Sequence, residues 1–335
     1  MISIFLLIAG AIVALVGRLG LKSSPIARSL IVAIRLPRHR AALAATCPAC
    51  AAASEEATAT MPIHMAKWGT AGPEVLLIHG GVQGGLGGGP ATFREQKVLA
   101  QRGWQLLVPD RPGFGDSPTR GPDDMEADSL WVAASLGDGA HLVGHSFGGA
   151  VALLAAARRP SAVRSLILIE PALIPLLPGS EVMRRNAPAR EDFLRMGEAW
   201  LKTRTPAEYA LTLARDLGVV SQTDSDPIKA GEEPDAETAN ALGCSLLQAR
   251  IASGDAIRRA AKIVSEARIP VLFITGGWKP TFEAVAEIGA KATNGRHVII
   301  SAPNHFVQLV SPDAFNETIV EFMKAADAGR VFMKS

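Results

Sequence analysis

Cysteine is scarce in this sequence of 335 residues, which contains only Cys47, Cys50 and Cys244. Three cysteines are too few and too unevenly spaced for the framework of a small disulfide-stapled fold. Cys47 and Cys50 have the spacing of a redox motif or of half a zinc site, but no second Cys/His pair at ligand spacing accompanies them. We therefore interpret both as incidental thiols. No motif predicts a metal or an organic cofactor.

The sequence also lacks an excess of charge of one sign. Its net charge is +2, from 34 basic and 32 acidic residues. Six of the basic residues precede Glu55, the first acidic residue, so the rest of the chain is mildly acidic. A nucleic-acid partner would need a basic face on the folded body, and we therefore expect none. The hydrophobic content of 48% is enough to bury a substantial core.

No charged residue occurs in the first 17 positions, which are mostly Ile, Leu, Ala and Val. This stretch is of marginal length for a bilayer core about 30 Å thick. Positive charges follow it rather than precede it, which argues against an ordinary signal peptide. We interpret residues 1–17 as a candidate membrane anchor. By the positive-inside tendency, the main body would then be cytoplasmic, either free or attached to the membrane.

Two alternatives for the N-terminal region stay open. The stretch Ser29 to Ala45 resembles a second targeting segment and would mark a presequence. Translation could instead begin at Met61 or Met65, which would make everything before it an unselected extension. Apart from these alternatives, residues 1–60 are predicted to be an apolar, targeting-like segment and a flexible linker, because residues 41–60 are rich in alanine and poor in large apolar residues.

Beyond residue 60, strand patterns alternate with helix patterns. This predicts an α/β fold with a doubly wound, mostly parallel sheet that is covered by helices on both faces. From about residue 172 to residue 269 the strand patterns stop and helical periodicities replace them. We interpret residues 172–269 as a helical lid inserted between two parts of the core, residues 61–171 and 270–335. Lid helices are predicted at Glu191 to Thr203, Pro206 to Leu217 and Ala236 to Ser253.

The hexapeptide Gly144 to Gly149 lies between an apolar strand pattern, Ala140 to Val143, and an alanine-rich helix pattern, Ala150 to Arg158. Its glycines permit a sharp strand-to-helix turn in which neighbouring backbone segments approach closely. A serine at the centre of such a turn has strained backbone angles and an exposed hydroxyl. Ser146 is therefore the candidate nucleophile.

Further segments follow in a specific order along the chain. They are His79-Gly80-Gly81 after an apolar strand, the turn-rich Asp110 to Ser117, the serine hexapeptide, and Asn304-His305-Phe306 after the last strand. With this combination the chain resembles the α/β-hydrolase superfamily, specifically its Ser-His-acid branch, from about Met61 to Ala326.

The resemblance implies roles for residues around Ser146. His305 matches the family's terminal histidine and would be the general base. The backbone N–H of Phe147, at the start of the helix, and that of Gly81 would form an oxyanion hole. Val82 is an alternative to Gly81, because glycine-rich loops do not fix their register from sequence.

The acid is where the sequence departs from the most common family pattern. The loop after the penultimate strand, Gly276 to Pro280, contains no carboxylate. An alternative family position follows the strand after the serine helix, and Glu170 occupies it. A carboxylate at that sheet edge needs a cationic partner, which the imidazolium of His305 would supply. We favour Glu170 as the acid, with Glu283 as the alternative.

These residues predict a serine hydrolase that cleaves carboxylic esters or similar acyl compounds of small-molecule substrates through an acyl-enzyme. A serine in place of an aspartate argues against dehalogenase and epoxide-hydrolase chemistry on the same fold. Two other classes remain open: a cofactor-free C–C bond hydrolase or haloperoxidase-like enzyme using the same triad, and a binding protein without catalysis.

Overall fold

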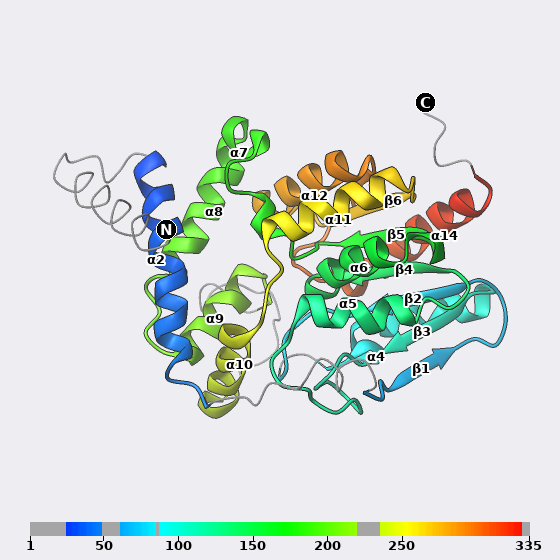
Figure 1. The fold of residues 1–335 in the computed structure, drawn as a ribbon, viewed down its shortest axis with the longest axis horizontal. Helices are drawn as coiled ribbons and strands as arrows, with labels where there is room; N and C mark the ends of the chain where they lie inside the picture. The colour runs from blue at the N-terminus through cyan, green and yellow to red at the C-terminus, as the bar shows by residue number, and fades with distance from the viewer. Residues whose placement is uncertain (1–24, 49–60, 85–86, 220–234, 330–335) are drawn as a thin grey trace. The chain divides into compact units, whose positions relative to one another are not determined.

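The computed structural model describes residues 25–48, 61–84, 87–219 and 235–329 (Figure 1). The chain divides into two compact units. The smaller combines the N-terminal helix with residues 187–247, and the larger contains the remaining described residues. The predicted anchor, residues 1–17, lies outside the described residues. Within them, no helix is both long enough and apolar enough to cross a bilayer.

A seven-stranded sheet is the centre of the larger unit, and its strand order is β1-β3-β2-β4-β5-β6-β7. Only β1 runs antiparallel to its neighbour, and the other pairs are parallel. The predicted doubly wound, mostly parallel sheet is therefore confirmed. The strands are β1 (Met65–Trp68), β2 (Glu74–Ile78), β3 (Gln105–Pro109), β4 (Ala140–His145), β5 (Val163–Ile169), β6 (Val271–Thr275) and β7 (Arg296–Ile299).

The winding of the chain reverses beside β2. The chain passes from β2 to β3 on one side and then crosses to β4 on the other side of β2. Ligands of open parallel sheets bind outside the carboxyl ends of strands at such a switch point. The segments that follow β2 and β4, which begin with His79 and Ser146, are therefore adjacent at this edge.

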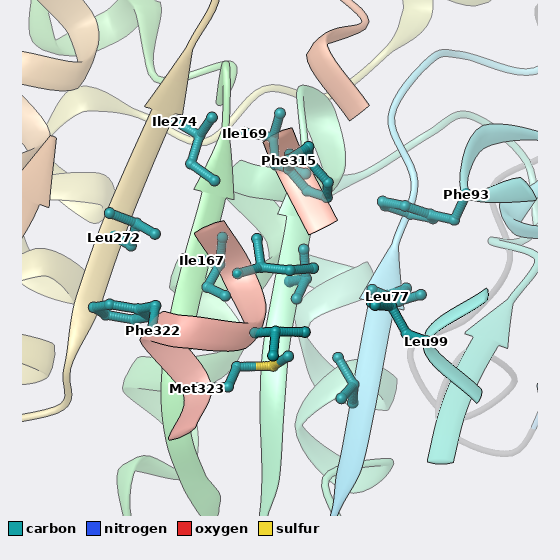
Figure 2. Close-up of a cluster of buried hydrophobic side chains, with 14 of the residues drawn as sticks. Leu77, Phe93, Leu99, Ile167, Ile169, Leu272, Ile274, Phe315, Phe322 and Met323 are labelled. Atoms are coloured by element: carbon teal, nitrogen blue, oxygen red, sulfur yellow. The ribbon is translucent and has the colours of Figure 1, made fainter. Parts of the chain in front are cut away.

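Helices cover both faces of the sheet. One face packs on α14 (Pro312–Asp327) and on the 3₁₀ helix η2 (Arg94–Arg102) in a cluster of buried side chains (Figure 2). The opposite face packs on α6 (Phe147–Arg158) and α12 (Pro280–Thr293). A side chain at Gly144 would lie 2.8 Å from the Cβ of Ala152 in α6, and Gly289 of α12 packs on Phe273 of β6.

The larger unit contains several further helices. Residues 89–102 form the short α4 and the 3₁₀ helix η2, and Gly103 ends this segment in a left-handed conformation with φ of 86°. The remaining elements are α4 (Gly89–Thr92), α5 (Met125–Ala134), η3 (Pro160–Ala162), η4 (Ile174–Leu176), α7 (Glu181–Arg185), α11 (Gly254–Glu266) and α13 (Val307–Val310).

The described residues of the smaller unit form the helices α2 (Pro25–Ala44), α8 (Ala187–Trp200), α9 (Pro206–Asp216) and α10 (Ala236–Gln248). Their last three correspond to the helices predicted for the lid. Helix α2 was not expected, since its residues were interpreted as targeting segment and linker. It packs on α8, where Arg28 forms ion pairs of 2.7 Å with Glu191 and Glu198 and Val32 lies against Gly197.

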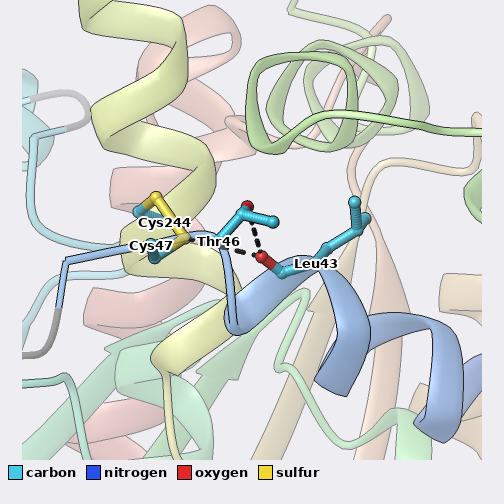
Figure 3. Close-up of a disulfide and its surroundings, with 4 residues drawn as sticks. All are labelled: Leu43, Thr46, Cys47 and Cys244. Carbon is cyan, nitrogen blue, oxygen red and sulfur yellow. Dashed lines mark hydrogen bonds between the residues drawn. A yellow bond between two sulfur atoms is a disulfide. The ribbon is translucent and has the colours of Figure 1, made fainter.

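Cys47 forms a disulfide with Cys244, with 5.5 Å between their Cα atoms (Figure 3). The bond joins the segment directly after α2 to α10. Just before it, the hydroxyl of Thr46 donates a 2.7 Å hydrogen bond to the carbonyl of Leu43 at the end of α2. The interpretation of Cys47 as an incidental thiol is therefore wrong. The partner is 197 residues away, so local spacing gave no sign of the bond.

Candidate active site

Ser146 has a strained backbone at the turn between β4 and α6. Its φ of 54° and ψ of −120° lie where residues with a side chain are rarely found. The surroundings hold it there: its N–H donates to the carbonyl of Ile169 at 2.9 Å, and its carbonyl accepts from the N–H of Ala172 at 2.9 Å. A side chain at Gly144 would lie 2.5 Å from the carbonyl oxygen of Gly148, so the turn needs glycine there.

His305 and Glu170 form a buried pair beside this turn. The distance from Nδ1 of His305 to Oε2 of Glu170 is 2.7 Å. Both side chains are almost completely shielded from solvent, with exposed fractions of 2% and 0%. Within the described residues, Nε2 of His305 is buried and has no hydrogen-bond partner. One imidazole nitrogen is thus fixed by a carboxylate, and the other is free to accept a proton.

The residue before Ser146 connects the turn to His305. Nε2 of His145 donates to the backbone carbonyl of His305 at 3.0 Å, and the two imidazole rings lie 4.8 Å apart. The ring of Phe282 lies on His305 at the same centroid distance of 4.8 Å. These contacts place the His305–Glu170 pair against His145, the residue before Ser146, although His305 and Ser146 are far apart in the sequence.

The loop after β6, which lacks a carboxylate, provides donors to Glu170. Oε1 of Glu170 accepts from the N–H of Gly276 and from Nε1 of Trp278, both at 2.9 Å. Together with His305, three donors therefore fix both oxygens of the carboxylate. The loop in which the most common family pattern would place the acid thus hydrogen-bonds to a carboxylate that follows the neighbouring strand β5.

Glu283, the alternative acid, contacts a different histidine. Its Oε1 accepts from the N–H of Gly277 at 3.0 Å, and its Oε2 accepts from the hydroxyl of Thr275 at 2.8 Å. His297, not His305, lies 3.4 Å from Oε2. Burial raises the pKa of the Glu283 carboxyl. The structure therefore does not place Glu283 with Ser146 and His305.

Backbone N–H groups are available where the resemblance implies an oxyanion hole. The loop after β2 packs against the nucleophile, since a Cβ at Gly80 would lie 2.6 Å from the Cβ of Ser146. Phe147 is the first residue of α6, so its N–H has no partner within the helix. In the described part of the chain, no acceptor is found for the N–H of Gly81 or Val82. Both therefore remain candidates for the second donor.

Comparison with known protein families shows to which family the chain with this site belongs. A family model described as the alpha/beta hydrolase fold matches residues 73–312. The chain belongs to the α/β-hydrolase fold family. The match extends from the residue before β2 to the first residue of α14, and so includes every residue of the site described above.

Two curated proteins are similar in sequence to parts of this α/β hydrolase, and one of them is much longer than this chain. It is 29% identical over 283 residues to the polyketide synthase ThaQ of Burkholderia thailandensis, covering 78% of this chain but 12% of that protein. It is 40% identical over 95 residues to a pimeloyl-[acyl-carrier protein] methyl ester esterase of Neisseria meningitidis, 28% of this chain and 29% of the esterase. The chain thus spans less than a third of either relative.

A solved structure resembles nearly the whole α/β hydrolase. It is described as a bacterial membrane phospholipase A and virulence factor, and its 23% identity accompanies a TM-score of 0.55. The alignment covers 97% of this chain and 99% of the phospholipase chain. At this identity the similarity demonstrates a common fold.

Two other histidines near Ser146, His79 and His145, have structural contacts in this α/β hydrolase. Nε2 of His79 accepts from the N–H of Arg111 at 2.8 Å, and its Nδ1 donates to the carbonyl of Gly80 at 2.8 Å. Burial, reinforced by the Arg111 cation, lowers the pKa of His79 to about 3. Burial also lowers the pKa of His145. Both side chains are therefore neutral at pH 7.

Asp110 holds the glycine-rich turn that it begins, since its Oδ2 accepts from the N–H of Asp116 at 3.3 Å and its carbonyl accepts from the hydroxyl of Ser117 at 2.7 Å. Its Oδ1 accepts from the N–H of Gly89 at 2.9 Å, and its Oδ2 accepts from Nδ1 of His64 at 2.8 Å. The next residue, Arg111, received no role from the sequence. The structure places its side chain completely out of solvent, directly behind the loop after β2. In the sequence, only the position of Arg111 beside Asp110 in a family motif could have indicated a role for it.

Proposed function

We propose that this α/β hydrolase is a serine hydrolase that cleaves carboxylic esters or similar acyl compounds through an acyl-enzyme. The observation that carries the proposal is the buried His305–Glu170 pair, which contacts His145 in the turn of Ser146 and has no described hydrogen-bond partner at Nε2 of His305. A serine hydroxyl is a weak nucleophile unless a base removes its proton during attack. This arrangement provides the base, fixes its orientation and supplies a carboxylate for the imidazolium that forms.

The proposed reaction follows from these contacts. The hydroxyl of Ser146 attacks the substrate carbonyl, and its proton moves to Nε2 of His305. The negative charge on the tetrahedral oxygen is stabilised by the N–H of Phe147, by the N–H of Gly81 or Val82, and by the positive end of the α6 dipole. His305 then returns the proton to the leaving alcohol. A water molecule, activated by the same imidazole, releases the acid and restores Ser146.

Similarity to an esterase supports the choice of ester substrates over the other chemistries considered. The related Neisseria protein is a methyl ester esterase, and no specific observation favours a C–C bond hydrolase or a haloperoxidase. Association with a membrane through residues 1–17 stays a prediction, since those residues lie outside the described part of the chain.

A fluorophosphonate probe and a series of p-nitrophenyl esters test the proposal. The wild-type protein is expected to be labelled and to hydrolyse at least one ester of the series, and Ser146→Ala is expected to lose both properties while remaining folded. Labelling without ester turnover would favour another reaction on the same triad. Absence of labelling in the folded protein would favour a binding protein and overturn the proposal.

A further inference from the structure

Arg111 lies behind the loop that carries the candidate oxyanion donors and contacts it directly. Its Nη1 donates to the carbonyl of Gly81 at 3.0 Å and reaches that of Gly80 at 3.4 Å. The remaining donors of the guanidinium are held by two carboxylates: Nε donates to Asp128 at 2.9 Å, and Nη2 donates to Asp123. All three side chains are out of contact with solvent, with exposed fractions of 0–1%.

The charge of Arg111 is balanced locally. Arg120 completes the cluster, since its Nη2 donates to the second oxygen of Asp128 at 2.7 Å. The buried cluster then consists of two cations and two anions. Its net charge is zero, so it would not stabilise a negatively charged intermediate through its charge. Burying such a cluster usually adds little stability, because desolvation offsets the attraction between the charges. Its position therefore suggests a task other than stabilising the fold.

That task is apparent from the geometry of the peptide bonds. In a planar trans peptide, the C=O and the following N–H point in opposite directions. Because the carbonyls of Gly80 and Gly81 face Arg111, the N–H groups of Gly81 and Val82 point away from it. The network also holds the next residue, since Oδ2 of Asp123 accepts from the N–H of Gln83 at 3.0 Å.

Arg111 also contacts the residue that carries the other donor. The Cζ atom of its guanidinium lies 4.2 Å from the centroid of the Phe147 ring, a favourable cation–π contact. Phe147 provides the N–H at the start of α6. A single buried side chain therefore contacts both halves of the oxyanion hole, the loop after β2 and the first residue of α6.

We propose that Arg111 is a positioning residue for the oxyanion hole, which orients the peptides of Gly80 and Gly81 and fixes the Phe147 side chain so that the N–H donors of both segments converge. The inference rests on the proposed serine-hydrolase function. Arg111 itself does not touch the substrate. Its effect is on the tetrahedral intermediate and not on the ground state, because the N–H donors act fully only where the negative charge develops.

Arg111→Lys and Arg120→Lys form a matched pair of test variants. Both keep a cation in the same buried cluster, but only the first removes the guanidinium donors to the loop carbonyls, since Arg120 bonds to Asp128 and to the carbonyl of Asp124. The Gly80 carbonyl keeps its bond from Nδ1 of His79, so the change falls mainly on the peptide of Gly81. We expect Arg111→Lys to lower kcat by roughly 10- to 100-fold, part of the loss seen when an oxyanion donor is removed, with KM within about twofold. Arg120→Lys should keep kcat within about threefold.

Affinity for a boronic acid inhibitor separates positioning from loss of folded protein. A boronate forms a tetrahedral adduct with the serine, so its affinity should fall in Arg111→Lys by the same factor as kcat/KM. Equal losses of activity in the two variants, in proportion to lost folded protein, would overturn the inference. A change confined to KM, with kcat unaltered, would also overturn it.

A second variant is available if Arg111→Lys does not fold. Arg111→Met combined with Asp123→Asn removes one charge of each sign and is judged by the same readouts. An inactive, unlabelled wild type would instead refute the proposed function.

Discussion

The proposed role of Glu170 as the acid can be tested separately from that of Glu283, the alternative acid. Replacing it with Gln keeps the size of the side chain but presents an amide to Nδ1 of His305, which favours the wrong tautomer. We expect Glu170→Gln to lower kcat by about 10³–10⁴-fold, as loss of the acid does in a serine triad. Steady-state hydrolysis of a p-nitrophenyl ester measures the change.

Glu283→Gln is the matched control for that measurement. It alters a carboxylate in the first turn of α12, after β6, which bonds to Thr275 and Gly277 and not to His305. We expect its kcat to stay within a fewfold of wild type. If Glu283→Gln alone lost turnover, the assignment of the acid would be wrong.

Some residues of the candidate site could be predicted from the sequence around them, and others could not. Ser146 and Glu170 directly follow apolar strands, so the strand pattern alone placed both at one sheet edge. The choice between Gly81 and Val82 stayed open, because either N–H fits a loop whose peptides are oriented by side-chain contacts from elsewhere. Arg111 was missed for a related reason: its partners, Asp123 and Asp128, lie 12 and 17 residues further along the chain.

At the scale of elements, buried strands and the strand–turn–helix around Ser146 were predictable because their signal is local. Apolar runs bounded by glycine or proline indicate parallel strands without further information. Helix α2 was not predictable in this way. Its alanine- and arginine-rich sequence becomes a packed helix through contacts with α8, such as the ion pairs of Arg28 with Glu191 and Glu198. Tertiary packing supplies most helical stability in proteins.

The disulfide is the covalent part of that packing and leads to a prediction about the smaller unit. Replacing Cys47 and Cys244 with Ser should lower the free energy of unfolding by about 2–4 kcal/mol, because the bond restricts a long segment of the unfolded chain. Thermal unfolding, followed with and without reductant, measures the effect. Reductant should lower Tm of the wild type and leave the double variant unchanged. An equal response of both proteins would contradict a stabilising role.

At the scale of the whole molecule, the disulfide bears on where the protein folds. Such bonds persist in oxidising compartments and are rare where glutathione keeps thiols reduced. The bond between Cys47 and Cys244 is therefore an observation against the cytoplasmic placement favoured by the charge pattern of the N-terminal region. That placement depends on residues outside the described part of the chain and stays a prediction.

Buried neutral histidines make the larger unit sensitive to acid. Burial lowers the pKa of His79 to about 3 and that of His141 to about 4, and lowers that of His145 as well. The unfolded chain binds protons at these positions below about pH 6.5, whereas the folded chain does not. Stability should therefore fall as the pH drops from about 6.5 to 4, by up to about 1.4 kcal/mol per pH unit for each histidine.

His141 provides the variant that isolates this effect, because it lies away from the candidate site. Its Nδ1 is 2.8 Å from the hydroxyl of Ser165, and its Nε2 is 3.3 Å from Asp327, beside Arg164. Urea unfolding of wild type and His141→Gln at pH 7 and pH 5 should show a smaller loss of stability in the variant. Carboxyls whose pKa is raised by burial, such as that of Glu283, act in the opposite direction but equally in both proteins. An identical pH slope in the two proteins would mean that folding does not lower the pKa of His141.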